Sequence, residues 1–207
     1  NEAQVRQALD WQEELWPWER YRAVVMAAVR AAVPVFGGNL PRQHMTQAQR
    51  NPNFDTHLSP AAWQRQQTAV REGHCNLLPE RLLVPMARIQ LARDQSLALS
   101  ALQALQPART VVLVAGFAHV QRQLGIPTWL PPNLEAKVAI AQAGQAQAAI
   151  EKEADELYLT PALPAHDACA ELRQQWQAPP AGAGAVTPAA DAAAPNAAAP
   201  VHAPAAP

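Results

Sequence analysis

The chain has 207 residues, of which 49% are hydrophobic and 16% charged, a composition that excludes a fully disordered protein. Its 16 basic and 17 acidic residues form no basic stripe, so nucleic acid is not an expected partner. The longest apolar stretches, 23–29 and 111–115, are much shorter than the roughly 20 residues of a membrane-spanning helix, so we expect no transmembrane segment.

The sequence predicts two helices in the first half of the chain, and the first of them leads into a strand. Apolar residues at helical spacing predict a helix over 18–32, and the short apolar run 32–36, closed by two glycines, predicts a strand. Further along, Pro79 at a first-turn position and a leucine-rich face predict a long helix over 80–105. Pro85, near the start of this helix, predicts a kink.

A parallel sheet is the expected partner of these helices. The fully apolar run 111–115 is typical of a strand buried on both faces of such a sheet, and 137–140 and 156–159 are weaker strand candidates. The order of elements predicts an α/β domain, a mostly parallel β-sheet flanked by helices, with right-handed crossovers. We assign residues 1–177 to this domain and expect its first β-α unit to be missing, because no strand precedes the first helix. The Ala/Pro-rich residues 178–207 predict a disordered tail.

The cysteines and histidines predict neither a cross-link nor a metal centre. Cys75 and Cys169 lie far apart and fit neither a disulfide framework nor a short metal-binding spacing, so they leave the redox compartment open. The histidines are scattered along the chain. A zinc site needs three or four ligands at suitable spacing, and we do not expect one here.

Two loops follow predicted strands, and ligands of open parallel sheets bind at such loops. The first covers 37–44 and contains Arg42, for which a solvated charge is the alternative interpretation. The second contains Gly116, which lets the backbone approach a ligand, and His119, which presents an imidazole near the same edge. An isolated histidine is more often a hydrogen-bonded structural group, but its position directly after an apolar run favours a site.

Two further groups of side chains are open to a structural or a functional interpretation. Gln90, Arg93 and Asp94 share one surface of the long predicted helix, either as part of a site or as an exposed face with an intrahelical pair. Four aromatic residues gather at the start of the first predicted helix: Trp11, Trp16, Trp18 and Tyr21. They form either core contacts or the lining of a large planar ligand, with the Tyr21 phenolate as an iron ligand.

Six motifs follow one another between residues 11 and 143. They are Trp16-Pro17-Trp18 with Tyr21, Asn39-Leu40-Pro41-Arg42, Gly73-His74-Cys75 with Leu77-Leu78-Pro79-Glu80, Gln90 with Arg93-Asp94, Gly116 with His119-Val120, and Gly125-Ile126-Pro127. This ordered set resembles the ChaN-like haem-binding uptake family, in the superfamily that also contains the Tiki metalloproteases. The combination is fairly specific, whereas no single motif is decisive.

The resemblance implies a haem-binding protein of the bacterial cell envelope, a periplasmic or outer-membrane lipoprotein that serves haem and iron uptake by binding without turnover. Haem is the implied cofactor, and the implied partners are a second copy, in a homodimer formed on haem binding, and envelope haem-transport components. Tyr21 is the candidate axial ligand, and His119 beside Gly116 is the second ligand or a hydrogen-bonding partner. Arg42 and Arg93 are expected to pair with the haem propionates, because a guanidinium matches a carboxylate in two parallel hydrogen bonds.

The alternative is a Tiki-like metal-dependent hydrolase or protease. In it, His119 would be a metal ligand, and Asp94 or Glu80 would supply a second ligand or a base. Such relatives use two Gly-x-x-His motifs, of which only the second, 116–119, is present here. The lipid-anchoring cysteine of the family is not found either, and an N-terminal truncation would explain both differences. A third possibility is a fragment that binds nothing.

Overall fold

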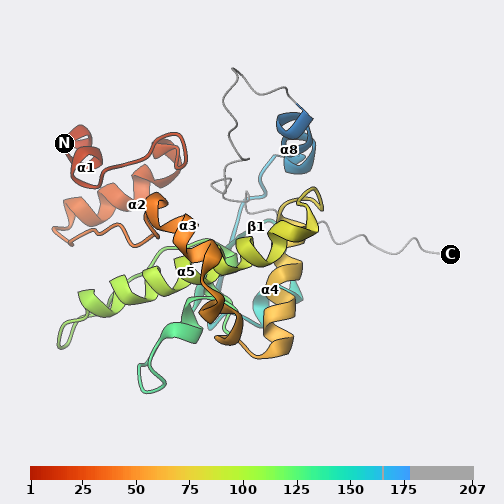
Figure 1. Ribbon diagram of the computed structural model, residues 1–207. Coiled ribbons are helices and arrows are strands. Elements are labelled where there is room, and N and C mark those ends of the chain that lie inside the picture. Colours follow the sequence, from red (N-terminus) through yellow and green to blue (C-terminus); the bar gives the residue numbers. More distant parts are fainter. Residues whose placement is uncertain (165, 178–207) are drawn as a thin grey trace.

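A computed structural model describes residues 1–164 and 166–177 (Figure 1). The helices are α1 (Glu2–Ala8), α2 (Trp18–Arg30), α3 (Arg42–Arg50), α4 (Pro60–Gly73), α5 (Glu80–Ala104), α6 (Phe117–Val120), α7 (Ala148–Glu151) and α8 (Ala168–Gln177). Two short 3-10 helices, η1 (Pro52–Thr56) and η2 (Ile126–Trp129), and two strands, β1 (Ala139–Ala143) and β2 (Glu156–Thr160), complete the elements. The predicted tail, 178–207, lies outside the described residues. Among the described helices, none has the length and apolarity to cross a membrane.

Helix α5 is the central element, and it confirms the predicted long helix to within one residue at its end. Pro85 lies inside the helix without ending it. Apolar side chains project from several faces of α5, so neighbouring elements bury it from more than one side. Towards α3 and α4, one buried cluster contains Met45, Val70, Leu78, Leu83, Met86, Ala87 and Ile89. A second cluster contains Ala48, Phe54, Leu58, Ala62, Leu91, Ala92 and Leu124.

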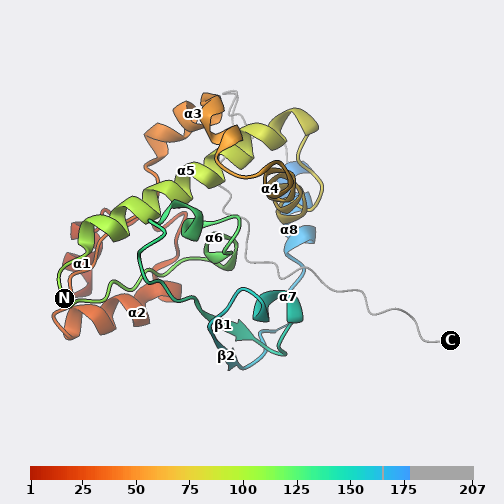
Figure 2. The same cartoon turned by 90° about the horizontal axis from the view of Figure 1, so that it is seen from below.

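The sheet has two parallel strands among the described residues, β1 and β2, paired from Ala139 opposite Glu156 to Ala143 opposite Thr160. The single turn α7 lies in the connection between the two strands and covers the sheet with Ile150. Figure 2 shows α3 on one side of α5 and the sheet on the other, with α6 between α5 and the sheet. The predicted α/β class with a parallel sheet is therefore confirmed, and its strands come from the two weaker candidates.

The two stronger strand predictions were wrong. Residues 32–36 and 111–115 contain neither helix nor strand, and neither segment pairs with another described segment. Phe36 is 70% exposed and Val112 is 81% exposed. An apolar run becomes a strand only where a neighbouring backbone accepts and donates the ladder hydrogen bonds, and these runs meet no such neighbour among the described residues.

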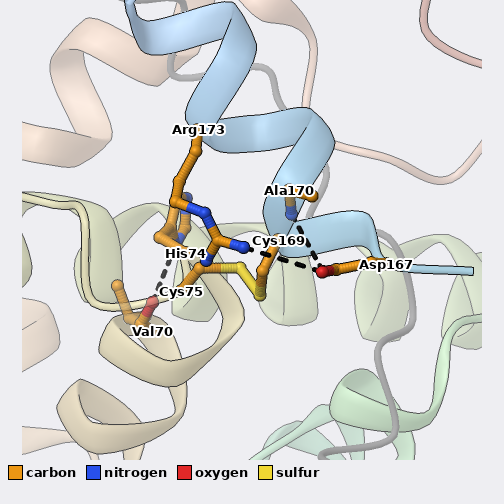
Figure 3. The surroundings of a disulfide bond; sticks show 7 residues. All are labelled: Val70, His74, Cys75, Asp167, Cys169, Ala170 and Arg173. Carbon is orange, nitrogen blue, oxygen red and sulfur yellow. Dashed lines mark hydrogen bonds and ion pairs between the residues drawn. A yellow bond between two sulfur atoms is a disulfide. The ribbon is translucent and has the colours of Figure 1, made fainter.

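A disulfide joins Cys75 and Cys169, contrary to the prediction from their spacing (Figure 3). Cys75 lies in the turn between α4 and α5, and Cys169 lies in the first turn of α8. The two Cα atoms are 5.6 Å apart although 94 positions separate the residues in the sequence. The prediction failed because pairing at this separation depends on how the chain folds back, which spacing alone does not encode.

Candidate functional site

The candidate site is built around a histidine and a buried carboxylate from two different elements. The imidazole Nδ1 of His119 on α6 lies 2.6 Å from Oδ1 of Asp94, in the buried middle of α5. The His119 side chain is 21% exposed and the Asp94 side chain 2% exposed. Gly116 precedes α6, and its carbonyl oxygen accepts a hydrogen bond from the His119 backbone N–H at 2.9 Å. The ring therefore has one nitrogen fixed to the core, while part of its surface faces solvent.

The electrostatics of the pair are set by the burial of Asp94. Burial raises the pKa of the Asp94 carboxyl from 3.8 to about 6, and the hydrogen bond from His119 and the charges of His119 and Arg93 oppose this rise. When the carboxylate is ionised, it accepts a hydrogen bond from Nδ1–H of His119, which leaves the Nε2 lone pair available to a ligand. Metal-ligating histidines commonly have their second nitrogen held in this way by a carboxylate. The arrangement thus leaves Nε2 of His119 as a nitrogen donor.

Arg93 lies next to Asp94 on α5 and is also buried. Its guanidinium Nη2 points toward α3, where it lies 3.9 Å from the sulfur of Met45. The burial of Arg93 and Asp94 decides against the interpretation of this helix surface as an exposed face. Arg42 is exposed at the first residue of α3, one turn before Met45. Arg93 therefore contacts α3 from the core, whereas Arg42 belongs to the exposed start of that helix.

Tyr21 belongs to a separate aromatic cluster at the start of α2. Its ring lies 5.6 Å from the ring of Trp11 and 5.8 Å from that of Trp16, between centroids. Trp11 in turn packs edge to face on Trp18, at 4.9 Å. Within the described residues, no hydrogen bond, ion pair or ring contact joins Tyr21 to His119. The structure thus confirms the aromatic cluster and brings His119, Asp94 and Arg93 together without Tyr21.

The segment that begins at Gly73 serves the fold. His74 is buried, and its Nδ1 lies 2.7 Å from the carbonyl oxygen of Val70 (Figure 3). Cys75 is in the disulfide, and the carboxylate of Glu80 forms an exposed ion pair with Arg71. Glu80 is 14 residues before Asp94 on α5, which corresponds to about 21 Å along a helix. Glu80 therefore does not share a site with His119.

Sequence patterns placed Asp94 at one site with His119 only in the hydrolytic alternative, and they did not predict the hydrogen bond between the two side chains. The sequence signal that pointed to this pairing was Asp94, an acidic residue that shares one helix surface with Gln90 and Arg93. That spacing does not show which loop faces the helix. Among the described residues, no group of three or more His, Cys, Asp or Glu side chains is arranged to hold a metal ion.

A family model described as "Haem-binding uptake, Tiki superfamily, ChaN" matches residues 1–130. That range ends before β1 and contains the five candidate haem-binding residues: Tyr21, Arg42, Arg93, Gly116 and His119. No curated protein and no solved structure matches the chain.

Proposed function

Because the chain belongs to the ChaN family of haem-binding uptake proteins in the Tiki superfamily, we propose that it binds haem for uptake at the bacterial cell envelope without chemical turnover. The observation that carries this proposal is the His119–Asp94 pair, a partly exposed imidazole whose Nδ1 is held by a buried carboxylate. A haem iron is held by an axial nitrogen, oxygen or sulfur donor, and in this proposal Nε2 of His119 supplies the nitrogen.

The arginines supply charge that suits an anionic porphyrin. Arg42 is exposed on α3, so its guanidinium is accessible to a propionate. Arg93 is buried beside Asp94, so in this proposal its positive charge acts mainly on the carboxylate that holds His119. Phe117 lies two residues before His119 and Val120 directly after it, and both pack against the apolar cluster of Val138, Ile140 and Ile150. Apolar neighbours of this kind favour a largely hydrophobic ligand.

The second axial ligand is proposed to come from a second copy of the chain. Tyr21 has no contact with His119 within one protomer, and it lies in an aromatic cluster that suits a planar ring. A haem held between His119 of one copy and Tyr21 of another would use both residues. This arrangement predicts a homodimer that forms when haem binds.

The cell-envelope location is supported by the disulfide between Cys75 and Cys169. Disulfides persist in oxidising compartments and are rare in the cytosol of most organisms. The Tiki-like hydrolase is not favoured, because among the described residues the His119–Asp94 pair has no third side chain arranged to complete a metal site.

A haemin titration followed by visible absorbance and by size-exclusion chromatography tests the proposal. We expect a saturable Soret shift and a change from monomer to dimer, both weakened in His119→Ala and Tyr21→Phe. The matched control is His44→Ala, which removes an exposed histidine from α3 and is expected to bind haemin as the wild type does. Equal binding by the wild type and His119→Ala would contradict the proposed ligand. Nonsaturable binding by the wild type would contradict the proposed function.

A further inference from the structure

Gly125 lies so close to the backbone of His119 that no side chain would fit at position 125. A Cβ atom built on Gly125 would lie 2.1 Å from the carbonyl oxygen of His119, 2.5 Å from its carbonyl carbon and 3.1 Å from its Cα. Gly125 has a φ of −100°, which lies outside the left-handed region, so φ does not require glycine here. What requires glycine is the space occupied by the His119 main chain.

Hydrogen bonds and buried neighbours hold Gly125 in place. The carbonyl oxygen of Gly125 accepts hydrogen bonds from the backbone N–H of Thr128 at 3.0 Å and from the Thr128 hydroxyl at 2.8 Å. Its neighbours on either side, Leu124 and Ile126, are buried. Leu124 packs in the cluster that includes Leu91 of α5. A shift of Gly125 would therefore disturb core packing.

The His119 side of the contact is less strongly held. Helix α6 is a single four-residue turn with no fully buried residue, and Phe117 and Val120 pack only partly buried against the cluster of Val138, Ile140 and Ile150. The polar anchor of the His119 side chain is the 2.6 Å hydrogen bond to Asp94, whose position on α5 is fixed. A methyl group at position 125 would consequently displace the His119 backbone rather than the segment 124–128.

We propose that Gly125 is a positioning residue that sets the place of His119 relative to Asp94, and hence the direction in which Nε2 meets a ligand. The contact itself is independent of the ligand, whereas the part of the proposal that concerns haem iron rests on the function proposed above. The Gly125-Ile126-Pro127 motif thereby acquires a role at the site. Gly125 gives close approach, and Ile126 anchors the segment in the core.

The test compares Gly125→Ala with Gly37→Ala. A Cβ atom on Gly37 would meet no other atom within 4 Å, and Gly37 has no left-handed φ, so the same substitution there adds a methyl group in open space. The first measurement uses the protein without haemin. It follows the downfield NMR resonance of the His119 Nδ1 proton, assigned by its loss in His119→Ala. We expect that resonance to shift or disappear in Gly125→Ala and to stay unchanged in Gly37→Ala.

The second measurement is the visible spectrum of the haemin complex. We expect the haemin complex of Gly125→Ala to have the same visible spectrum as that of His119→Ala. Added imidazole, which replaces the missing nitrogen ligand, should shift both spectra toward that of the wild type. A wild-type NMR signal in Gly125→Ala would overturn the proposal, as would loss of its cooperative melt, because the contact would then hold the fold rather than His119. If wild type and His119→Ala bind haemin identically, the proposed function fails, while the NMR comparison still decides the role of Gly125.

Discussion

Replacing Asp94 with asparagine should stabilise the fold and change how its stability depends on pH. Burial raises the pKa of Asp94 from 3.8 to about 6, a difference of roughly two pKa units. Each unit corresponds to about 1.4 kcal/mol, so the ionised carboxylate costs the folded state about 3 kcal/mol. Asparagine has nearly the same shape and carries no charge, so at pH 7 Asp94→Asn should gain up to about 3 kcal/mol in free energy of unfolding.

The sign of the pH dependence follows from the direction of the shift. Because the folded state binds the Asp94 proton more tightly than the unfolded state does, this contribution to stability is fully present below about pH 4. This stabilising contribution is lost as the pH rises from about 4 to about 6, and it is absent above about pH 6. Relative to Asp94→Asn, the wild type should therefore become progressively less stable across this window.

Urea denaturation at pH 4, 5, 6 and 7, at constant ionic strength, measures this difference. The control is Asp10→Asn, which changes an exposed aspartate whose φ of 47° asparagine adopts readily. Its stability should follow that of the wild type at each pH. A constant difference between wild type and Asp94→Asn from pH 4 to pH 7 would refute the reasoning. The same substitution should weaken haemin binding, because a neutral amide holds Nδ1–H of His119 less strongly than a carboxylate does.

Two further changes test the packing and the cross-link. Replacing Cys75 and Cys169 together with serine should cost about 4 to 5 kcal/mol of stability, because the disulfide closes a long loop in the unfolded chain. Thermal melts of this variant should show the loss without reductant, and an unchanged melting temperature would contradict it. Ile89→Ala, at a fully buried position of α5, should cost about 2 to 5 kcal/mol in urea denaturation. Leu99→Ala, on the same helix at a position 51% exposed, should cost much less, and equal losses would argue against the described core.

Local sequence patterns predicted two of the described helices. The helix predicted over 18–32 is α2, which ends two residues earlier, and the one predicted over 80–105 is α5. Helix α4 was missed although Ser59 caps it and Pro60 occupies its first turn, a recognisable start signal. Helices can be predicted from local patterns because their backbone hydrogen bonds are made within the segment.

Strands and cross-links depend on partners elsewhere in the chain, and there the sequence was less informative. The apolar run 111–115 has strong β-propensity, yet the structure pairs the less apolar 139–143 with 156–160. At the site, the predicted loop position of His119 after a strand was wrong, because His119 lies on the single-turn helix α6 and no strand precedes it among residues 111–116. Its hydrogen bond with Asp94 was not predicted, because the spacing of residues on α5 does not identify the segment that packs over them.

The disulfide also makes a closed ring of the backbone from Cys75 to Cys169. That ring contains α5, α6 and both strands, so a single proteolytic cut inside it leaves the two pieces covalently bonded until the disulfide is reduced. The ring also crosses the end of the family match at residue 130. A chain shortened to the matched residues would therefore carry Cys75 as an unpaired, oxidisable thiol, and studies of haem binding should keep Cys169 in place.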